Sequence, residues 1–200
     1  MGRPRSFDEN SVLDAAAAEF RVHGFTETST DRLCEAAGVR RSSLYNAFTS
    51  KDELFVRALD RYTGLALERY ARALDDDRLN GAERLTLLVE GLVEEERVAL
   101  EHGHAAGCMV VQTMMSPDLR ERDERVPRIL DQDLREHLDL IEGVIRTGRL
   151  DGSIRADVEP RDGALLVITL IFGLRVTAQA GFTPEVLRQV ALNGLASLLT

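Results

Sequence analysis

The residues best suited to chemistry lie near the start of the chain, on a short amphipathic segment at residues 41–48. In a helix over these residues, Leu44 and Phe48 would face inward. The side chains left outward are those of Arg41, Ser42, Tyr45 and Asn46. A guanidinium, a hydroxyl, a phenol and an amide on one face suit hydrogen bonds to nucleic-acid bases and phosphates. The spacing therefore predicts a recognition helix.

Neighbouring helices must position this segment. Apolar residues recurring at i, i+3, i+4 and i+7 predict a helix over residues 6–23, opened by a Ser6–Glu9 capping box and stopped at Gly24. A short helix over residues 29–37 follows. Gly38 then supplies the positive φ that a tight turn into the next helix requires. Two short helices joined in this way indicate a helix-turn-helix.

The remainder of the chain also has helical periodicity. Ser50 and Glu53 predict a second capping box, at the start of a long helix. Further helices are expected around residues 85–92 and 130–145, and over residues 162–180 and 183–199. We therefore expect an all-α protein of about nine helices. A three-helix head over residues 1–52 would precede a larger antiparallel helical body over residues 53–200.

Composition excludes several classes of protein. The 200 residues have no apolar run of the ~18 residues that a membrane span needs, and the longest run covers residues 164–174. Two cysteines, Cys34 and Cys108, are too few for a disulfide framework, so a reducing cytoplasm is expected. No sequence motif for a hydrolase, a nucleotide site or a zinc protease occurs. We expect no enzymatic activity, no cofactor and no metal.

The charge is unevenly distributed along the chain. Residues 1–51 hold seven basic and seven acidic side chains, so the rest of the chain carries the whole formal charge of −9. An acidic protein would normally avoid nucleic acid, because phosphate neutralisation drives that affinity. This argument does not apply to the head, which has no net negative charge over residues 1–51. It concentrates Arg3, Arg5, Arg40, Arg41 and Lys51, the sole lysine, in three short stretches.

The stretch GFTETSTDRLCEAAGVRRSSLYNAFTSKDELF resembles the DNA-binding domain of the TetR/AcrR family of transcriptional regulators. Its Gly-Phe, Ala-Ala-Gly-Val, Leu-Tyr and Phe-x-Ser-Lys-x-Glu-Leu landmarks occur in the family's order, and the resemblance covers residues 7–60. It implies a cytoplasmic regulator, a repressor that a small molecule releases from a pseudo-palindromic operator. A helical binding protein or enzyme that does not regulate DNA is the alternative class, and Arg41, Tyr45 and Lys51 argue against it.

The resemblance also implies roles for individual residues. Arg41 and Ser42 stand where base contacts are commonest, and Tyr45 stands where a phosphate is touched. Lys51 matches the family's phosphate-binding lysine, at a helix N-terminus that itself favours anions. Ser29 and Thr30 are likewise placed for phosphate.

Two further features concern the DNA contacts. Arg40 departs from the family pattern, because it replaces the usual Ser or Thr cap of the recognition helix with a cation. Gly2-Arg3-Pro4-Arg5 resembles a minor-groove-binding arm, for which the alternative is a merely solvated tail. Beside a helix-turn-helix, we favour the arm.

For the body, we expect a homodimer through residues 162–180 and 183–199, and an effector site. The effector is expected to contact Cys108, Val111, Gln112, Met115, Phe172 and Arg175. Arg175 has two interpretations, an ion pair at the dimer seam or an anionic ligand, and seam pairing is favoured. Cys108 opens a Gly-Cys element found in one branch of the family, so a thiol sensor of oxidants or electrophiles is the alternative function. A packed thiol is the simpler interpretation.

Two other clusters in the body have simple interpretations. The acidic run at residues 94–96 is expected to be solvated surface. His102 and His104 could be imagined with Cys108 as a metal site, but a helix–helix turn with solvated histidines is favoured.

Overall fold

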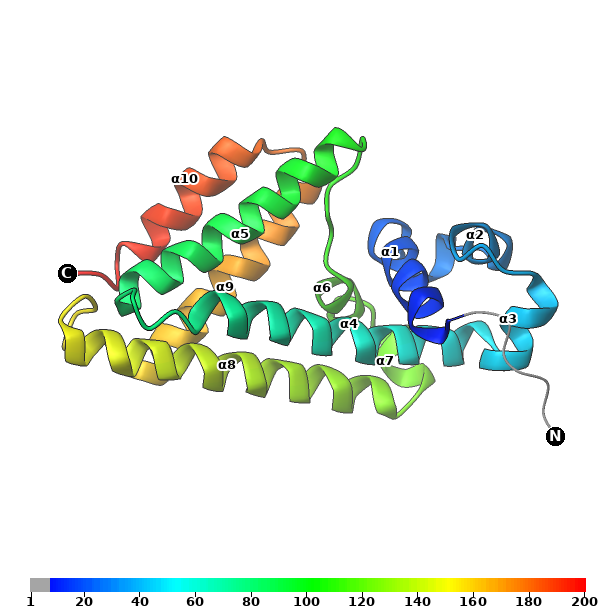
Figure 1. Ribbon diagram of the computed structural model, residues 1–200, viewed down its shortest axis with the longest axis horizontal. Helices are drawn as coiled ribbons and strands as arrows, with labels where there is room; N and C mark the ends of the chain where they lie inside the picture. The colour runs from blue at the N-terminus through cyan, green and yellow to red at the C-terminus, as the bar shows by residue number, and fades with distance from the viewer. Residues whose placement is uncertain (1–7) are drawn as a thin grey trace. The chain divides into compact units, whose positions relative to one another are not determined.

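The computed structural model describes residues 8–200, which form ten helices (Figure 1). They are α1 Glu9–Glu27, α2 Thr30–Ala36, α3 Arg41–Phe48, α4 Lys51–Leu74, α5 Gly81–Glu101, α6 Met109–Met114, α7 Pro117–Arg122, α8 Arg125–Asp151, α9 Pro160–Gln179 and α10 Pro184–Leu195. Within residues 8–200 no strand forms, and the single extended pairing is an isolated bridge between Ile154 and Leu199. The all-α prediction is confirmed. The number of helices is ten rather than nine because Pro117, which has no N–H to donate, starts a separate helix directly after α6.

The described chain divides into two compact units. Unit 1 comprises the residues up to Leu65 together with Cys108–Leu130, and unit 2 comprises Ala66–Gly107 and Asp131–Thr200. The helices α4 and α8 each pass from one unit into the other. Since α4 is continuous through residue 52, the predicted boundary at 52/53 lies inside a helix. That boundary remains a prediction about function.

The first helix begins at Glu9 because Asp8 caps it. The Asp8 carboxylate accepts hydrogen bonds from the main-chain N–H groups of Asn10 and Ser11, both at 3.2 Å. The predicted cap, Ser6, lies outside the described residues. Gly24 breaks the helix at the predicted stop, with φ 73° and ψ 171°, and a short helical turn resumes after it.

The helix-turn-helix prediction is confirmed in its geometry. Ser29 caps α2 by accepting a hydrogen bond from the Arg32 N–H at 3.2 Å. Gly38 has the expected positive φ, 63°, in the turn between α2 and α3. The predicted bounds of the recognition helix, residues 41–48, are those of α3.

Half of the capping box predicted for α4 is present. The Ser50 hydroxyl accepts a hydrogen bond from the Glu53 N–H at 3.0 Å. The Glu53 carboxylate, which was expected to reach back to the cap, instead pairs with Arg125 at 2.6 Å. The first turn of α4 is therefore tied to the start of α8 by an ion pair.

The core of unit 2 is aliphatic. In it α10 packs along both α5 and α9 (Figure 1). At one end of unit 2 the backbones of α5 and α8 almost touch, because a Cβ on Gly81 would lie 2.5 Å from the Gly148 Cα. This close approach explains why both positions are glycine.

The helix α9 is long and apolar enough to cross a membrane by length and composition alone. Its most apolar window has a mean hydropathy of 1.4, and 44% of that window is buried. A core helix of a soluble protein passes the same test. The inward face of α9, which includes Val167, Ile168, Ile171 and Leu174, belongs to the core of unit 2. We therefore interpret α9 as a core helix.

Candidate nucleic-acid interface

The outer face of α3 carries the four side chains predicted to contact nucleic acid. Arg41, Ser42, Tyr45 and Asn46 are all exposed. Leu44 and Phe48 are buried on the opposite face. Because α3 is anchored by these two apolar residues, it presents the four polar side chains together.

Arg41 is held in place by weak contacts. Its Nη1 lies 3.3 Å from Oδ1 of Asp31, and its guanidinium carbon lies 5.7 Å from the centroid of the Tyr45 ring. Arg41 and Asp31 are both exposed, so this ion pair contributes little to stability. The guanidinium can exchange Asp31 for another acceptor at small cost.

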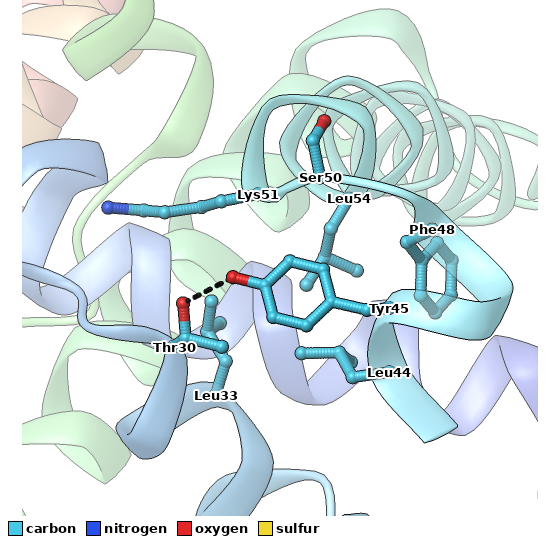
Figure 2. Close-up of a pocket in the computed structure, with 8 residues that line it drawn as sticks. All are labelled: Thr30, Leu33, Leu44, Tyr45, Phe48, Ser50, Lys51 and Leu54. Carbon is cyan, nitrogen blue, oxygen red and sulfur yellow. Dashed lines mark hydrogen bonds between the residues drawn. The ribbon is translucent and has the colours of Figure 1, made fainter. Parts of the chain in front are cut away.

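Tyr45 connects α3 to the beginning of α2. Its hydroxyl lies 3.1 Å from the Thr30 hydroxyl, and Figure 2 shows the phenol directed toward Thr30. Ser29 precedes Thr30 as the cap of α2. The structure thus brings together Ser29, Thr30 and Tyr45, which the sequence assigned separately to phosphate contacts.

Lys51, the first residue of α4, lines a small surface depression together with Thr30 and Tyr45 (Figure 2). Its Nζ lies 4.3 Å from the centroid of the Phe25 ring, a cation–π contact. Burial lowers the pKa of Lys51 from its ordinary value, Arg122 lowers it further, and Asp52 opposes both. A partly desolvated ammonium at a helix N-terminus attracts an anion more strongly than a fully hydrated one.

Of the three remaining basic residues predicted to contact DNA, the structure describes Arg40. Arg40 is exposed at the N-cap of α3 and makes no side-chain capping hydrogen bond, as its departure from the family pattern predicted. Arg3 and Arg5 lie outside the described residues. Their role in a basic arm remains a prediction.

The residues expected to contact an effector belong to different units. Cys108, Val111, Gln112 and Met115 belong to unit 1, while Phe172 and Arg175 belong to unit 2. Met115 is 78% exposed, and Gln112 donates a hydrogen bond to the main-chain oxygen of Arg21 at 2.6 Å. Phe172 is half-buried against the unit 2 core. Their shared role as effector contacts remains a prediction.

Arg175, for which the sequence favoured an ion pair at the dimer seam, forms ion pairs within its own chain. It is buried and pairs with Glu95 and with Glu96, whose Oε1 lies 2.6 Å away. The expectation that residues 94–96 are solvated is wrong for Glu96, which is fully buried. Its Oε2 accepts a hydrogen bond from the Ala106 N–H at 2.8 Å. Glu96 is buried because it pairs with the buried Arg175. The sequence of three consecutive acidic residues does not show which of them has a buried partner.

Sequence reasoning missed a second buried polar group, on α8. His137 and Asp133 are both buried, and Nδ1 of His137 donates to the Asp133 main-chain oxygen at 2.8 Å. The Asp133 carboxylate lies 3.2 Å from the same nitrogen as a neighbouring charge. The Tyr70 ring meets the imidazole edge-on, with centroids 4.6 Å apart. The i,i+4 spacing of two polar residues on an apolar face is the signal that could have identified this pair.

This pair makes stability depend on pH. Burial lowers the pKa of His137, but the hydrogen bond and charge of Asp133 outweigh it, so the pKa lies above its usual 6.5. The imidazolium therefore stabilises the fold fully below the unfolded pKa, and this contribution is lost as pH rises through the folded pKa. We expect His137→Gln to reduce the unfolding free energy, measured in urea, more at pH 5.5 than at pH 9. Exposed His102→Gln serves as the control, and equal losses for His137→Gln at both pH values would contradict the assignment.

The histidines of the α5–α6 connection contact main-chain oxygens. Nδ1 of His102 lies 2.9 Å from the Val98 oxygen, and Nδ1 of His104 lies 2.9 Å from the Ala105 oxygen. Within residues 8–200 no group of three or more His, Cys, Asp or Glu side chains has an arrangement that could hold a metal. Cys108 is half-buried at the N-cap of the six-residue α6.

Taken together, a helix-turn-helix with a polar outer face and a cation at the next helix start defines a DNA-binding protein. Comparisons with known proteins agree. The family model described as "Bacterial regulatory proteins, tetR family" matches residues 12–58. The HTH-type transcriptional repressor ComR of Escherichia coli (strain K12) is 30% identical over 95% of this chain and 88% of its own length. The repressor BdcR of the same organism is 38% identical over 61% of this chain, and the match spans 60% of BdcR.

A solved structure is similar over nearly the whole chain. It is a cysteine mutant of the TetR family transcriptional regulator CifR, complexed with 26-base-pair operator DNA. It is 31% identical, has a TM-score of 0.78, and the match covers 97% of this chain and 98% of that one. This chain therefore belongs to the TetR family and is a DNA-binding transcriptional regulator. These comparisons support the repressor interpretation rather than thiol sensing at Cys108.

Proposed function

We propose that this regulator is a repressor that binds operator DNA as a homodimer and leaves it when a small molecule binds. The observation that carries the proposal is the exposed polar face of α3, held outward by Leu44 and Phe48. In this proposal residues 1–52 bind DNA, and residues 53–200 bind the effector and dimerise. The protein acts in the cytoplasm by binding, without catalysis.

Each polar group has an assigned partner on the duplex. Arg41, Ser42 and Asn46 face the bases in the major groove, where guanidinium and amide groups can read donor and acceptor patterns. The phosphate contacts come from Ser29, Thr30, Arg40, Tyr45 and Lys51. Arg3 and Arg5 follow the minor groove. Local positive charge at these positions allows a chain of net charge −9 to approach DNA.

The outward faces of α9 and α10 support the dimer. They form an apolar groove of about 230 Å³, with Phe182, Val186 and Val190 among its lining residues. These three side chains expose 51%, 44% and 62% of their surface, an arrangement that favours burial against a second copy. Two-fold pairing there would present two recognition helices about one DNA turn apart, so the operator should be a pseudo-palindrome.

In this proposal the effector and the operator affect each other's binding through thermodynamic linkage. A small molecule that favours a head spacing unsuited to the operator lowers DNA affinity by some factor. Operator DNA must then weaken the binding of that molecule by the same factor. The predicted effector contacts are Cys108, Val111, Gln112, Met115, Phe172 and Arg175.

The decisive experiment is selection of bound duplexes from a random DNA pool by the purified full-length protein, followed by a salt titration. Recovery of an inverted repeat would establish dimeric, sequence-specific binding. Recovery of no enriched sequence, with weak and salt-sensitive retention alone, would contradict the proposal. The selected site then serves as the probe for all later binding measurements.

Arg41→Ala is expected to reduce affinity for the selected site by about 10- to 100-fold, because a bidentate base contact is worth about 1–3 kcal/mol. Binding to an unrelated duplex should change much less. The matched control is Arg78→Ala, which removes an exposed arginine in unit 2 that is paired with Asp76. Equal losses on both duplexes for Arg41→Ala would show that Arg41 contacts phosphate and reads no base.

A further inference from the structure

The break in α1 at Gly24 creates a need for an external hydrogen-bond donor. A residue at φ 73° and ψ 171° interrupts the helical ladder, so carbonyl groups of the preceding turn require other partners. At the break itself, the buried Thr28 hydroxyl donates a hydrogen bond to the Gly24 oxygen at 2.6 Å. The Arg21 main-chain oxygen accepts a hydrogen bond from Nε2 of Gln112, a residue of α6 that is distant in the sequence, at 2.6 Å.

The residue after this break supports the DNA-contacting lysine. Phe25 packs against Phe20 and Phe55, with ring centroids 5.9 and 5.1 Å away. Lys51 Nζ lies over the same ring. Any change in the direction in which the chain leaves α1 therefore moves the surface on which the Lys51 side chain rests.

A second side chain from the same distant segment reaches this point. The Arg122 guanidinium carbon, at the end of α7, lies 5.2 Å from the Phe25 centroid. Its Nη1 also lies 3.3 Å from Oδ1 of Asp52, in the first turn of α4. Arg122 thus bridges Phe25 and the helix turn that carries Lys51.

We propose that Gln112 and Arg122 are positioning residues for DNA binding. Gln112 fixes the end of α1, and Arg122 fixes Phe25 against the start of α4, so that Lys51 is presented correctly to a phosphate. The inference rests on the proposed function and deepens it. It explains why residues 108–130, far from the head in sequence, form one compact unit with it.

The same segment is anchored at its other end within unit 2. The Ala106 N–H donates to buried Glu96, which pairs with Arg175 of α9. Residues 107–111 connect that anchor to Gln112.

The test exploits Lys51 being the sole lysine. Protein labelled with ¹³C at lysine Cε gives one side-chain signal, which the Phe25 ring current shifts from its ordinary position. Gln112→Met and Gln112→Glu, which cannot donate to a carbonyl, should move this signal toward the ordinary position. Gln112→Arg, which keeps a donor and adds no lysine, should retain the shift. A space-filling role for Gln112 would make the three variants alike.

Amide exchange and DNA binding provide the second and third measurements. Exchange at residues 22–27 should accelerate roughly tenfold in Gln112→Met, the equivalent of one hydrogen bond, and operator affinity should fall by a similar factor. Arg122→Met should raise the pKa of Lys51, because removing a neighbouring positive charge favours the ammonium form. Arg120→Met, at an exposed position of the same segment, is the control.

The outcomes separate the two proposals. Unchanged lysine shift and amide exchange in Gln112→Met, in protein with wild-type melting temperature, would overturn the positioning role of Gln112. An unchanged Lys51 pKa in Arg122→Met would overturn that of Arg122. Wild-type protein that enriches no duplex would instead overturn the proposed function, while the lysine signal still reports whether Gln112 orders the end of α1.

Discussion

Arg175→Met is expected to lower the free energy of unfolding by about 3–5 kcal/mol, because it leaves a buried carboxylate without its cation. Glu96 is fully buried, and the Arg175 guanidinium is its charged partner at 2.6 Å. The Ala106 N–H alone cannot compensate the desolvated charge. Urea denaturation at pH 7 measures the loss.

The double variant Glu96→Gln with Arg175→Met distinguishes charge burial from packing. The double variant leaves no fully buried charge, and the part-exposed Glu95 keeps its ion pair with Arg69, so it should recover much of the stability that Arg175→Met loses. The matched control is Arg188→Met, which breaks the half-exposed pair with Glu90 and should cost no more than about 1 kcal/mol. If Arg175→Met proved as mild as the control, the buried pair would not be a structural element of unit 2.

Val190→Asp is expected to convert the dimer into monomers and to reduce operator affinity by roughly 10²–10⁴-fold. A monomer can occupy one half-site at a time, so the gain from linking two binding sites is lost. Val190 is 62% exposed in the single chain, so aspartate there leaves the monomer fold intact. In a dimer, the same carboxylate would be buried without a partner. Sedimentation velocity and binding to the selected site measure the two effects.

Leu150→Asp is the control for this prediction. Leu150 is 90% exposed at the end of α8 and does not line the α9–α10 groove. It introduces the same charge at an exposed aliphatic position, and we expect it to remain dimeric and to bind DNA normally. A dimeric Val190→Asp with normal operator affinity would place the subunit interface elsewhere.

The first prediction concerns the inward face of α9, and the second concerns α10, which lines the outward groove together with α9. Arg175 lies on the inward face, whereas Leu165 and Val176 are each 53% exposed on the outside. The nearly continuous apolar sequence of α9 predicts burial on more than one side. A single chain buries one of these sides, and the second copy proposed above would cover the other.

Local sequence determined several features of the head. The Gly38 turn, the bounds of α3 and the outward polar set follow from helical period and from glycine's access to positive φ, which depend on neighbours within a few residues. The missing side-chain cap at Arg40 follows in the same way.

Tertiary structure alone decided which polar groups of the body are buried and what they contact. From the sequence, Glu96 is expected to be one of three exposed acidic residues. In the structure it is buried, because it pairs with Arg175, which lies 79 positions away in the sequence. Gln112 also donates a hydrogen bond to Arg21, 91 positions earlier, which its expected role as an effector contact does not reveal. Pairings of this kind depend on which helices pack together, and the periodicity of one helix shows that it has a buried face without showing what covers it.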